Sequence, residues 1–224
     1  MQQVILNYKD VDIYQGEHLV LGKVNFRVEE GEMVYLTGPV GSGKSSLLKS
    51  IYGEVSVEGS KADVLGFNML RLKTKHQPAL RRQMGIVFQD FQLLPDRTVH
   101  RNLDFVLRST GWKRKEDREK RIVEVLEMVK LGDKKDKFIF ELSGGEQQRI
   151  CIARAILNNP KVILADEPTG NLDPETTNDI MKLLMKIRDN GTTILMATHN
   201  YNLILKYPSR VISCANGTIT ESAK

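Results

Sequence analysis

The fold of this chain is decided by the stretch Gly38-Pro39-Val40-Gly41-Ser42-Gly43-Lys44-Ser45, with Ser46 directly after it. The apolar run Met33 to Leu36 precedes the stretch, and Ser46 to Ile51 follows it with helical character. This order of strand, loop and helix is the one that a phosphate-binding P-loop requires. The glycines let the backbone curl so that its N–H groups point at phosphate oxygens, and the helix directs its positive end to the same place.

Two side chains at the end of this P-loop have specific tasks in nucleotide binding. We expect Lys44 to reach the β- and γ-phosphates and the hydroxyl of Ser45 to ligate Mg²⁺ between them. The alternative is an ordinary glycine turn between strand and helix, but such a turn has no need of Gly-Lys-Ser at its end. The stretch therefore predicts ATP and Mg²⁺ as cofactors.

Two adjacent carboxylates follow another apolar run. Val162 to Ala165 reads as a buried strand, and Asp166 and Glu167 come directly after it. We expect Asp166 to lie beside the P-loop and hold Mg²⁺ through water, and Glu167 to act as the general base for the attacking water. An acidic pair after a strand can instead cap the next helix, but the P-loop upstream favours the catalytic interpretation.

Three further residues are candidates for the same site. His199 follows the apolar run Thr193 to Thr198 and can donate to the γ-phosphate, although a histidine there is often a cap. Gln89 follows the run Met84 to Phe88 and offers an amide to both metal and water, its alternative being a plain loop glutamine. Tyr14 can stack on adenine or simply pack within a small β-sheet.

A second glycine-rich helix start occurs at Leu142-Ser143-Gly144-Gly145-Glu146-Gln147-Gln148-Arg149, which we call the signature segment. Ser143, Gly144 and Gly145 open the helix from Glu146 to Leu157 and predict a second anion-binding N-terminus. Since the P-loop already serves the phosphates of its own copy, this segment is expected to close on the nucleotide of a neighbouring copy. A serine N-cap with loop glycines is the alternative.

Length and composition narrow the class of protein. The chain has 224 residues, a net charge of +5 and 41% hydrophobic residues, which suits one domain with an inserted lobe. No apolar stretch is long enough to span a bilayer and no secretion signal is apparent, so we expect a cytosolic protein. Cys151 and Cys214 have no metal-like spacing and are expected to be reduced core thiols.

Basic residues cluster in two parts of the chain, residues 113–137 and 71–82. Such clusters can hold nucleic acid or an anionic membrane surface. Acidic residues interleave with the first cluster at helical spacing, which favours the solvated side of a helix, with attraction to the inner leaflet as a secondary benefit.

The pattern along the chain predicts two kinds of sheet and a helical lobe. Short β-rich runs before residue 30 indicate an antiparallel sheet, and uniformly apolar strands from residue 33 onward indicate a parallel sheet covered on both faces. The expected parallel strands are Met33–Thr37, Met84–Phe88, Val162–Ala165 and Thr193–Ala197. Helices are expected between Val99 and Leu157 and after Pro174, and a hairpin at Asn216-Gly217 closes the chain.

These segments, together with Asn171-Leu172-Asp173, occur in the order and approximate spacing of ABC-type ATPases, a family that the chain resembles from about Val4 to Gly217. The resemblance implies an α/β fold: a P-loop NTPase with a RecA-like core, an antiparallel β subdomain and an α-helical subdomain. It places the β subdomain at about 1–37, the core at 38–90 and 160–224, and the helical subdomain at about 91–159. It also implies an ATP-dependent homodimer that sandwiches two ATP molecules between P-loops and signature segments, with Tyr14 on adenine.

Within that family, residues 88–99, 166–173 and 196–200 are most similar to the cell-division sub-family, the FtsE proteins. That resemblance implies a polytopic membrane partner of FtsX type, peripheral association with the cytoplasmic face of the inner membrane, and regulation of cell-wall hydrolysis. Phe91, Leu93 and Leu94 are expected to contact the partner, or else to pack internally.

Several rival classes stay open at this point. A lipoprotein-releasing or efflux ATPase of LolD/MacB type shares much of the pattern. DNA-repair ABC ATPases carry long insertions between the positions that correspond to Gln89 and Ser143. The segment between these residues is short in this chain, so no nucleic-acid partner is expected. A non-hydrolysing subunit is disfavoured by the presence of Lys44, Asp166 and Glu167.

Overall fold

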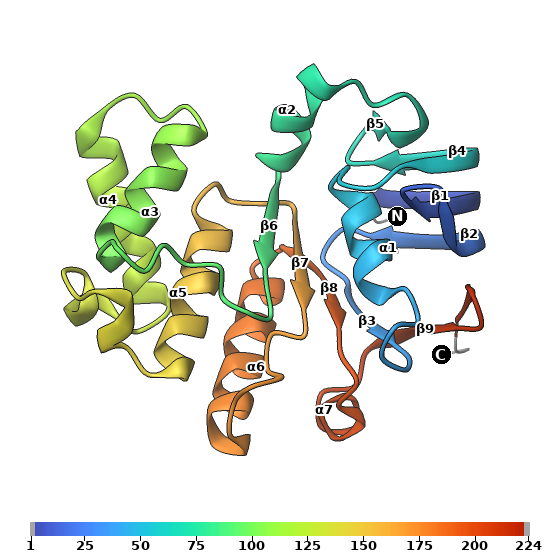
Figure 1. Cartoon of the computed structure of the whole chain (residues 1–224). Coiled ribbons are helices and arrows are strands. Elements are labelled where there is room, and N and C mark those ends of the chain that lie inside the picture. Colours follow the sequence, from blue (N-terminus) through green and yellow to red (C-terminus); the bar gives the residue numbers. More distant parts are fainter. Residues whose placement is uncertain (1–2, 222–224) are drawn as a thin grey trace.

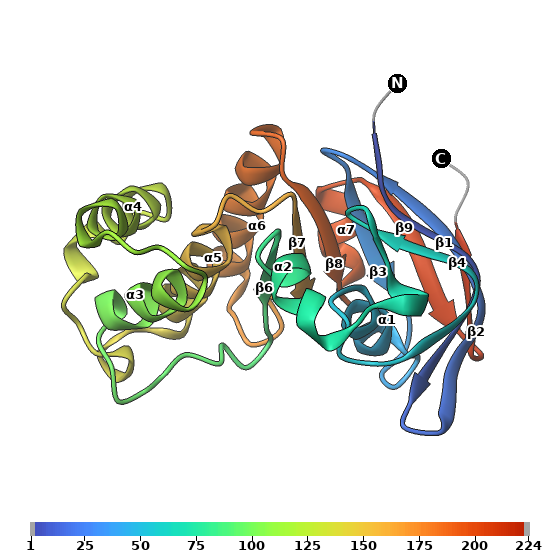
Figure 2. The ribbon, with the colours of Figure 1, turned by 90° about the horizontal axis from the view of Figure 1, so that it is seen from above.

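The computed structural model describes residues 3–221, which form two sheets and a separate group of helices (Figures 1 and 2). A four-stranded antiparallel sheet has the order β2-β1-β4-β5, and a six-stranded sheet has the order β10-β9-β3-β8-β7-β6. In the larger sheet, β9, β3, β8, β7 and β6 are parallel to one another and β10 pairs antiparallel with β9.

The bounds of the elements are as follows. The strands are β1 Val4–Gln15, β2 His18–Glu29, β3 Met33–Thr37, β4 Val57–Val64, β5 Phe67–Asn68, β6 Met84–Val87, β7 Val162–Asp166, β8 Thr193–Ala197, β9 Arg210–Ala215 and β10 Thr218–Glu221. The α-helices are α1 Lys44–Ile51, α2 Gln77–Arg81, α3 Val99–Ser109, α4 Lys115–Met128, α5 Gly144–Ile156, α6 Pro174–Asp189 and α7 Tyr201–Lys206. The short 3₁₀ turns are Met69–Arg71, Thr74–His76, Gly132–Lys134 and Ile139–Glu141.

The parallel strands are apolar throughout because both of their faces are covered. All five residues of β3 and of β8 are buried. Side chains alternate between two cores: Met33 and Tyr35 face the core that α6 and the helical lobe share, whereas Val34 and Leu36 face the core between the two sheets, where α1 packs. The sequence prediction of these strands and of a doubly covered sheet is confirmed.

Helices α3, α4 and α5 form the helical lobe, which lies beyond β6 and apart from the antiparallel sheet in both ribbon views (Figures 1 and 2). Each helix turns an apolar face inward, with Leu103, Ile122 and Ile150 fully buried. The helical character predicted between Val99 and Leu157 is confirmed, as are helix α6 and the terminal hairpin of β9 and β10.

Two details of the antiparallel sheet differ from the sequence prediction. The short runs His18 to Leu21 and Val24 to Val28 are one continuous strand, β2, which pairs along β1. In addition, β4 pairs with β1 and β5 pairs with β4 in this sheet, within the residues 38–90 that we assigned to the RecA-like core. The reason is that β4 is largely exposed and polar, so its place depends on backbone pairing rather than on an apolar pattern. The subdomain boundaries as a whole stay a prediction.

Candidate functional site

The P-loop adopts a backbone that only glycine permits at its key positions. Gly38, Gly41 and Gly43 have φ angles of 136°, 79° and 98°. A Cβ atom on Gly38 would lie 2.1 Å from the carbonyl oxygen of Cys214, and one on Gly43 would lie 2.8 Å from Cγ of Leu21. Positive φ therefore favours glycine at all three positions, and steric exclusion adds to it at Gly38 and Gly43.

Helix α1 begins at this loop without any cap of its own. Its N-cap is Gly43, no side chain hydrogen-bonds to its first turn, and that turn has no acidic residue. The free N–H groups and the positive dipole end are thus available to an anion. This geometry fits a nucleotide phosphate.

Lys44 is almost fully buried in the loop, with 7% of its surface exposed. Its Nζ donates to the carbonyl oxygens of Gly38 and Pro39 at 2.9 and 3.0 Å. The loop carbonyls thus hold the ammonium group inside the curve of the backbone. A phosphate that enters the loop can accept the same protons in a charge-assisted hydrogen bond.

The three predicted metal ligands line one cavity of about 680 Å³. Ser45 comes from the start of α1, Gln89 from the segment after β6, and Asp166 from the end of β7, with Asn171 beside them. A hydroxyl, an amide oxygen and a single carboxylate suit Mg²⁺, which keeps several waters and binds substrate phosphates. Within residues 3–221 there is no group of three or more His, Cys, Asp or Glu side chains that would hold a metal by itself.

Glu167 and His199 meet at the ends of β7 and β8. The Nδ1 atom of His199 lies 2.8 Å from Oε1 of Glu167, and the backbone N–H of His199 donates to Oε2 at 3.4 Å. The Glu167 side chain is 11% exposed, and its backbone has a φ of 46°, a strained value for a glutamate. Both residues line a second cavity of about 340 Å³. The structure thus pairs the expected base with the expected histidine.

The signature segment lies away from the P-loop of its own chain. In Figure 1 the start of α5 and the β3–α1 loop both lie on the lower side of the molecule, with β6 and β7 between them. Neither of the two cavities just described is lined by Ser143, Gly144 or Gly145. Ser143 and Gly144 are exposed, so the N-terminal end of helix α5 is accessible to a second molecule.

The signature helix caps itself. The Ser143 hydroxyl accepts from the backbone N–H of Glu146 at 3.3 Å, and the Glu146 carboxylate accepts from the backbone N–H of Ser143 at 2.8 Å. This reciprocal pair is a capping box. Both interpretations of the segment are therefore compatible with the structure: it is a serine N-cap, and it is also an exposed helix N-terminus.

The remaining predicted nucleotide ligands sit around these features. Val40 projects from the tip of the P-loop with 94% of its surface exposed, while Ser46 is buried one residue after Ser45. The Ser42 hydroxyl is buried and makes no hydrogen bond within residues 3–221. Tyr14 lies near the end of β1, partly buried, and does not line the cavity that holds Ser45. Its role against adenine stays a prediction.

Sequence reasoning missed the contacts of α5 with the segment after Gln89. Phe91 and Gln92 both have positive φ angles, 62° and 48°, and Arg154 donates to both of their carbonyl oxygens. The amide of Gln148 is also buried with both of its polar atoms unpaired in the described chain. No spacing pattern signals such features, because they depend on backbone conformation and tertiary position. Phe91 and Leu93 pack against the core of the helical lobe, which agrees with the internal-packing alternative.

Both cysteines are buried core residues, as predicted. Burial raises the pKa of the Cys151 thiol to about 12 and that of Cys214 to about 11. Neither thiol is ionised near neutral pH, so neither is a reactive nucleophile.

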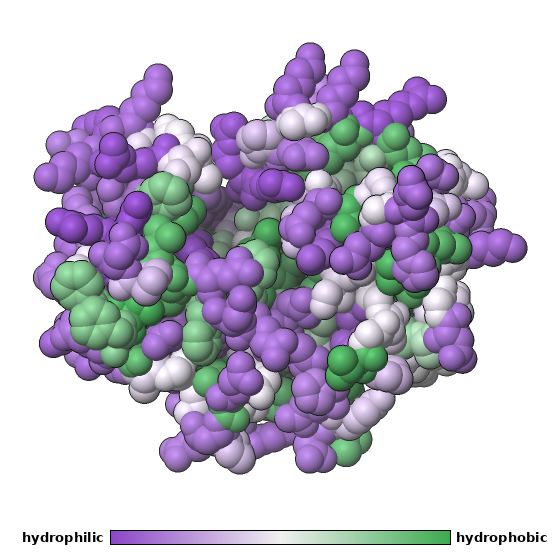
Figure 3. Space-filling view, in the orientation of Figure 1, coloured by the Kyte–Doolittle hydropathy of each residue, from purple (hydrophilic) through white to green (hydrophobic). Residues whose placement is uncertain are grey.

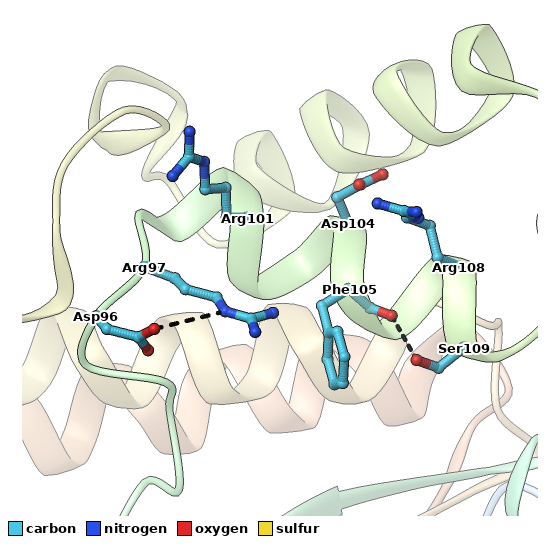
Figure 4. A pocket seen from close by; sticks show the side chains of 7 residues that line it. All are labelled: Asp96, Arg97, Arg101, Asp104, Phe105, Arg108 and Ser109. Atoms are coloured by element: carbon cyan, nitrogen blue, oxygen red, sulfur yellow. Dashed lines mark hydrogen bonds and ion pairs between the residues drawn. The ribbon is translucent and has the colours of Figure 1, made fainter.

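A basic hollow of about 780 Å³ lies along one side of α3 (Figure 4). Arg97 stacks over the ring of Phe105 at 4.9 Å and lies near Asp96, whereas Arg101 and Arg108 have no ion-pair partner within residues 3–221. Asp104 is neutralised by Arg118 of α4 at 2.6 Å. The hollow thus keeps a positive charge beside an exposed aromatic ring.

Exposed aromatic side chains also precede the signature segment. Phe138 and Phe140 stack with ring centroids 5.4 Å apart, and Phe140 is 75% exposed. Figure 3 shows apolar surface at the lower left, over the part of the chain that leads into α5. The helical lobe therefore presents both charge and apolar area to solvent.

Comparisons with known proteins agree with this geometry. Residues 21–170 match the ABC transporter family. The chain is 47% identical over 216 residues to the cell division ATP-binding protein FtsE of Streptococcus pneumoniae D39. The matched residues cover 96% of this chain and 94% of that protein. It is 44% identical over 199 residues to FtsE of Bacillus subtilis 168, with 89% and 87% covered. A solved dimeric ATP-binding cassette, in a post-hydrolysis state bound to ADP and Pi, has a TM-score of 0.84 and 35% identity over 98% of both chains.

Proposed function

Because the chain belongs to the ABC transporter family, we propose that it is the ATP-hydrolysing subunit of an FtsE-type complex that acts in cell division. The relatives at 44% to 47% identity are FtsE proteins, which disfavours the LolD/MacB alternative. The observation that carries the proposal is that Ser45 of the P-loop and Asp166 line one cavity, with Glu167 directly after Asp166 at the end of β7. The chain is an ATPase of this family; the residue roles below are our proposals.

The P-loop binds the triphosphate through its backbone N–H groups and through Lys44, which exchanges two loop carbonyls for phosphate oxygens. Ser45, Gln89 and Asp166 would hold Mg²⁺, whose charge offsets that of the β- and γ-phosphates when it is bound. These residues orient the γ-phosphate toward the end of β7. Tyr14 would pack against adenine.

Glu167 accepts a proton from the attacking water, since its carboxylate stands at the end of β7 one residue beyond Asp166. His199 touches that carboxylate at 2.8 Å. The contact orients Glu167 and leaves the other ring nitrogen of His199 able to reach the γ-phosphate. We assign to Gln89, which lines the neighbouring cavity with Ser45 and Asp166, a contact with the same water.

Two copies are needed for a complete site. The exposed Ser143 and Gly144 and the partly buried Gly145 of one copy would close on the γ-phosphate held by the P-loop of the other. A dimeric arrangement is also found in the solved cassette bound to ADP and Pi. ATP would favour the closed dimer by differential binding, and hydrolysis would remove the contact that closes it.

A polytopic membrane protein of FtsX type is the proposed partner, with the chain attached peripherally at the cytoplasmic face of the inner membrane. No helix within residues 3–221 is both long and apolar enough to cross a bilayer. The hollow on α3, with Arg101 and Arg108 unpaired, offers charge for contact with the partner. Dimer closure would move the helical lobe and, through it, the partner that regulates cell-wall hydrolysis.

The proposal is tested by purifying the tagged Glu167→Gln chain with ATP from detergent-solubilised membranes and identifying what co-elutes. A four-span protein with a compact extracytoplasmic domain supports the FtsX-type complex. A larger substrate-handling permease would point to the LolD/MacB class instead. Lys44→Ala serves as the control, because it should lose ATP-dependent co-elution.

A further inference from the structure

The segment after Gln89 contains an unusual turn. Phe91 and Gln92, two consecutive residues that are not glycine, both lie in the left-handed region, with φ of 62° and 48°. The backbone N–H of Gln92 donates to the carbonyl of Asp90 at 2.6 Å, which closes the turn. Such a conformation is costly for side chains with a Cβ atom and persists only where the surroundings enforce it.

Helix α5 supplies the contacts that enforce it. The guanidinium of Arg154 donates to the carbonyl of Gln92 at 2.5 Å and to that of Phe91 at 2.9 Å. The thiol of Cys151, one turn earlier in α5, donates to the same Phe91 carbonyl at 3.1 Å. Arg154 also lies over the ring of Phe88 at 5.9 Å. A planar guanidinium presents its donors in a fixed fork, so it fixes the orientation of the two carbonyls more tightly than the freely rotating ammonium group of a lysine would at this place.

The turn at Phe91 and Gln92 connects helix α5, which holds its carbonyls, to the nearby Gln89, whose side chain lies in the proposed site. Gln89 stands two residues before Phe91 and lines the cavity with Ser45 and Asp166. Ser143 is the N-cap of the same helix α5, so one rigid element carries both the signature serine and the side chains that hold the turn. Displacement of α5 would therefore be passed to the backbone next to Gln89.

We propose that Arg154 is a positioning residue, which holds the strained turn at Phe91 and Gln92 and thereby sets the place of Gln89 in the site. This inference rests on the proposed function, because it takes Gln89 to act in hydrolysis. Arg154 does not line the cavity that holds Ser45, Gln89 and Asp166. Its effect on turnover passes entirely through the backbone of the turn.

The test compares Arg154→Lys with Arg121→Lys by hydrogen exchange of the peptide that spans residues 88–94. Arg121 is a matched control because its guanidinium also donates to two carbonyls of the α5 end, those of Ile156 and Leu157, but does not touch the turn. We expect Arg154→Lys to speed exchange in this peptide about 10-fold and to lower kcat about 10-fold with KM for ATP nearly unchanged. Arg121→Lys should leave both the peptide and kcat close to wild type.

A second pair of variants avoids any change in α5. The Gln92 side chain is exposed and lines the same cavity as Gln89, and both replacements remove its amide, so the contrast between them reports backbone preference. Gln92→Val should loosen the turn and lower kcat because a β-branched residue disfavours positive φ, whereas Gln92→Gly should retain activity and restore part of the kcat lost in Arg154→Lys. Equal behaviour of the valine and glycine variants, or of the two lysine variants, overturns the inference.

Gln89→Ala separates this inference from the proposed function. If Gln89→Ala hydrolyses ATP at the wild-type rate, the role given to Gln89 fails, whatever the exchange data show. If Gln89→Ala is slow but Arg154→Lys matches wild type in both exchange and kcat, only the role of Arg154 fails. Since exchange is measured without turnover, a variant with weak activity still gives a result.

Discussion

The chain contains two glycine-rich helix starts, and they differ in how their first turns are satisfied. At α1 the N-cap is Gly43, no side chain caps the helix, and Lys44 is held inside the loop. At α5 the Ser143 hydroxyl accepts a hydrogen bond from the backbone N–H of Glu146, and the Glu146 carboxylate accepts one from the backbone N–H of Ser143. One helix start is left open to an anion, whereas the other is already occupied by its own side chains.

This difference indicates a division of labour. In our proposal the open end of α1 would bind phosphate within a single chain, because nothing has to be displaced apart from the carbonyl contacts of Lys44. The start of α5 carries the Glu146 carboxylate in its first turn, so in our proposal it would bind a phosphate only when a second copy brings that phosphate to the exposed Ser143. A permanent site in one copy and a conditional one in the other would make closure depend on ATP.

The largest effect is expected from Glu167→Gln. Because ATP is not hydrolysed in this variant, the start of α1 in one copy and the start of α5 in the other should stay closed on the same ATP. Turnover should fall by roughly 10²–10⁴-fold because the general base is lost, while ATP stays bound and the dimer stays closed. Steady-state hydrolysis and size-exclusion chromatography with ATP measure both. Hydrolysis near the wild-type rate would remove Glu167 from the role of base.

Substitutions at the two ends should have different consequences. Lys44→Ala should weaken ATP binding by about 10²-fold, since it removes charge-assisted hydrogen bonds to two phosphates. Ser143→Ala should leave ATP binding by one copy unchanged and prevent ATP-dependent dimers. Equilibrium binding of a fluorescent ATP analogue measures the first effect, and light scattering with ATP measures the second.

Mixing the two variants tests whether the sites are shared. A dimer of one Lys44→Ala copy and one Ser143→Ala copy can assemble at most one complete site. Activity of the mixture should therefore stay at or below half of the wild-type value. Recovery of the full wild-type activity would contradict the proposal that each site combines the start of α1 from one copy with the start of α5 from the other.

Glycine substitutions sharpen the same comparison on steric grounds. Gly38→Ala should lower ATP affinity at least 10-fold, because its Cβ atom would lie 2.1 Å from a carbonyl oxygen and its φ is 136°. Gly144→Ala should fold and bind ATP normally, since the nearest atom, on Leu172, is 3.8 Å from the new Cβ. Calorimetric titration of both variants gives the contrast, and equal losses in the two would show that the ends do not differ.

The smallest effect concerns the capping box at α5. Hydrogen bonding, chiefly from the Ser143 backbone N–H, holds the pKa of Glu146 below its usual value. The stability that this carboxylate contributes is thus fully present above its unfolded pKa and is lost as the pH falls through the lower folded value. Glu146→Gln should lower Tm by about 1–4 °C at pH 7 and weaken this acid dependence. Thermal unfolding at pH 7 and at lower pH checks both.

The sequence was sufficient where one local pattern determines both structure and chemistry. The strands β3 and β8 were predicted with their observed bounds, because a short uninterrupted apolar run in an α/β fold is typical of a parallel strand that is buried on both faces. Ser45, Gln89 and Asp166 were predicted separately, and the carboxyl edge of the parallel sheet brings them to one cavity. Their roles in catalysis stay predictions.

The sequence was insufficient where tertiary contacts decide the outcome. Strand β4 has no apolar run and owes its place in the antiparallel sheet to pairing with β1. The turn at Phe91 and Gln92 depends on a guanidinium more than sixty residues away, and the pairing of His199 with Glu167 depends on the adjacency of β7 and β8. Such features follow from the assembled fold and not from neighbouring residues.

The most direct test of the account is a crystal structure of the Glu167→Gln chain loaded with ATP. We predict a dimer in which the Ser143 hydroxyl of each copy lies about 3 Å from an oxygen of the γ-phosphate bound at the other copy's P-loop. The account would be contradicted if Ser143 were remote from every γ-phosphate in that structure while the wild-type chain hydrolysed ATP under the same solution conditions.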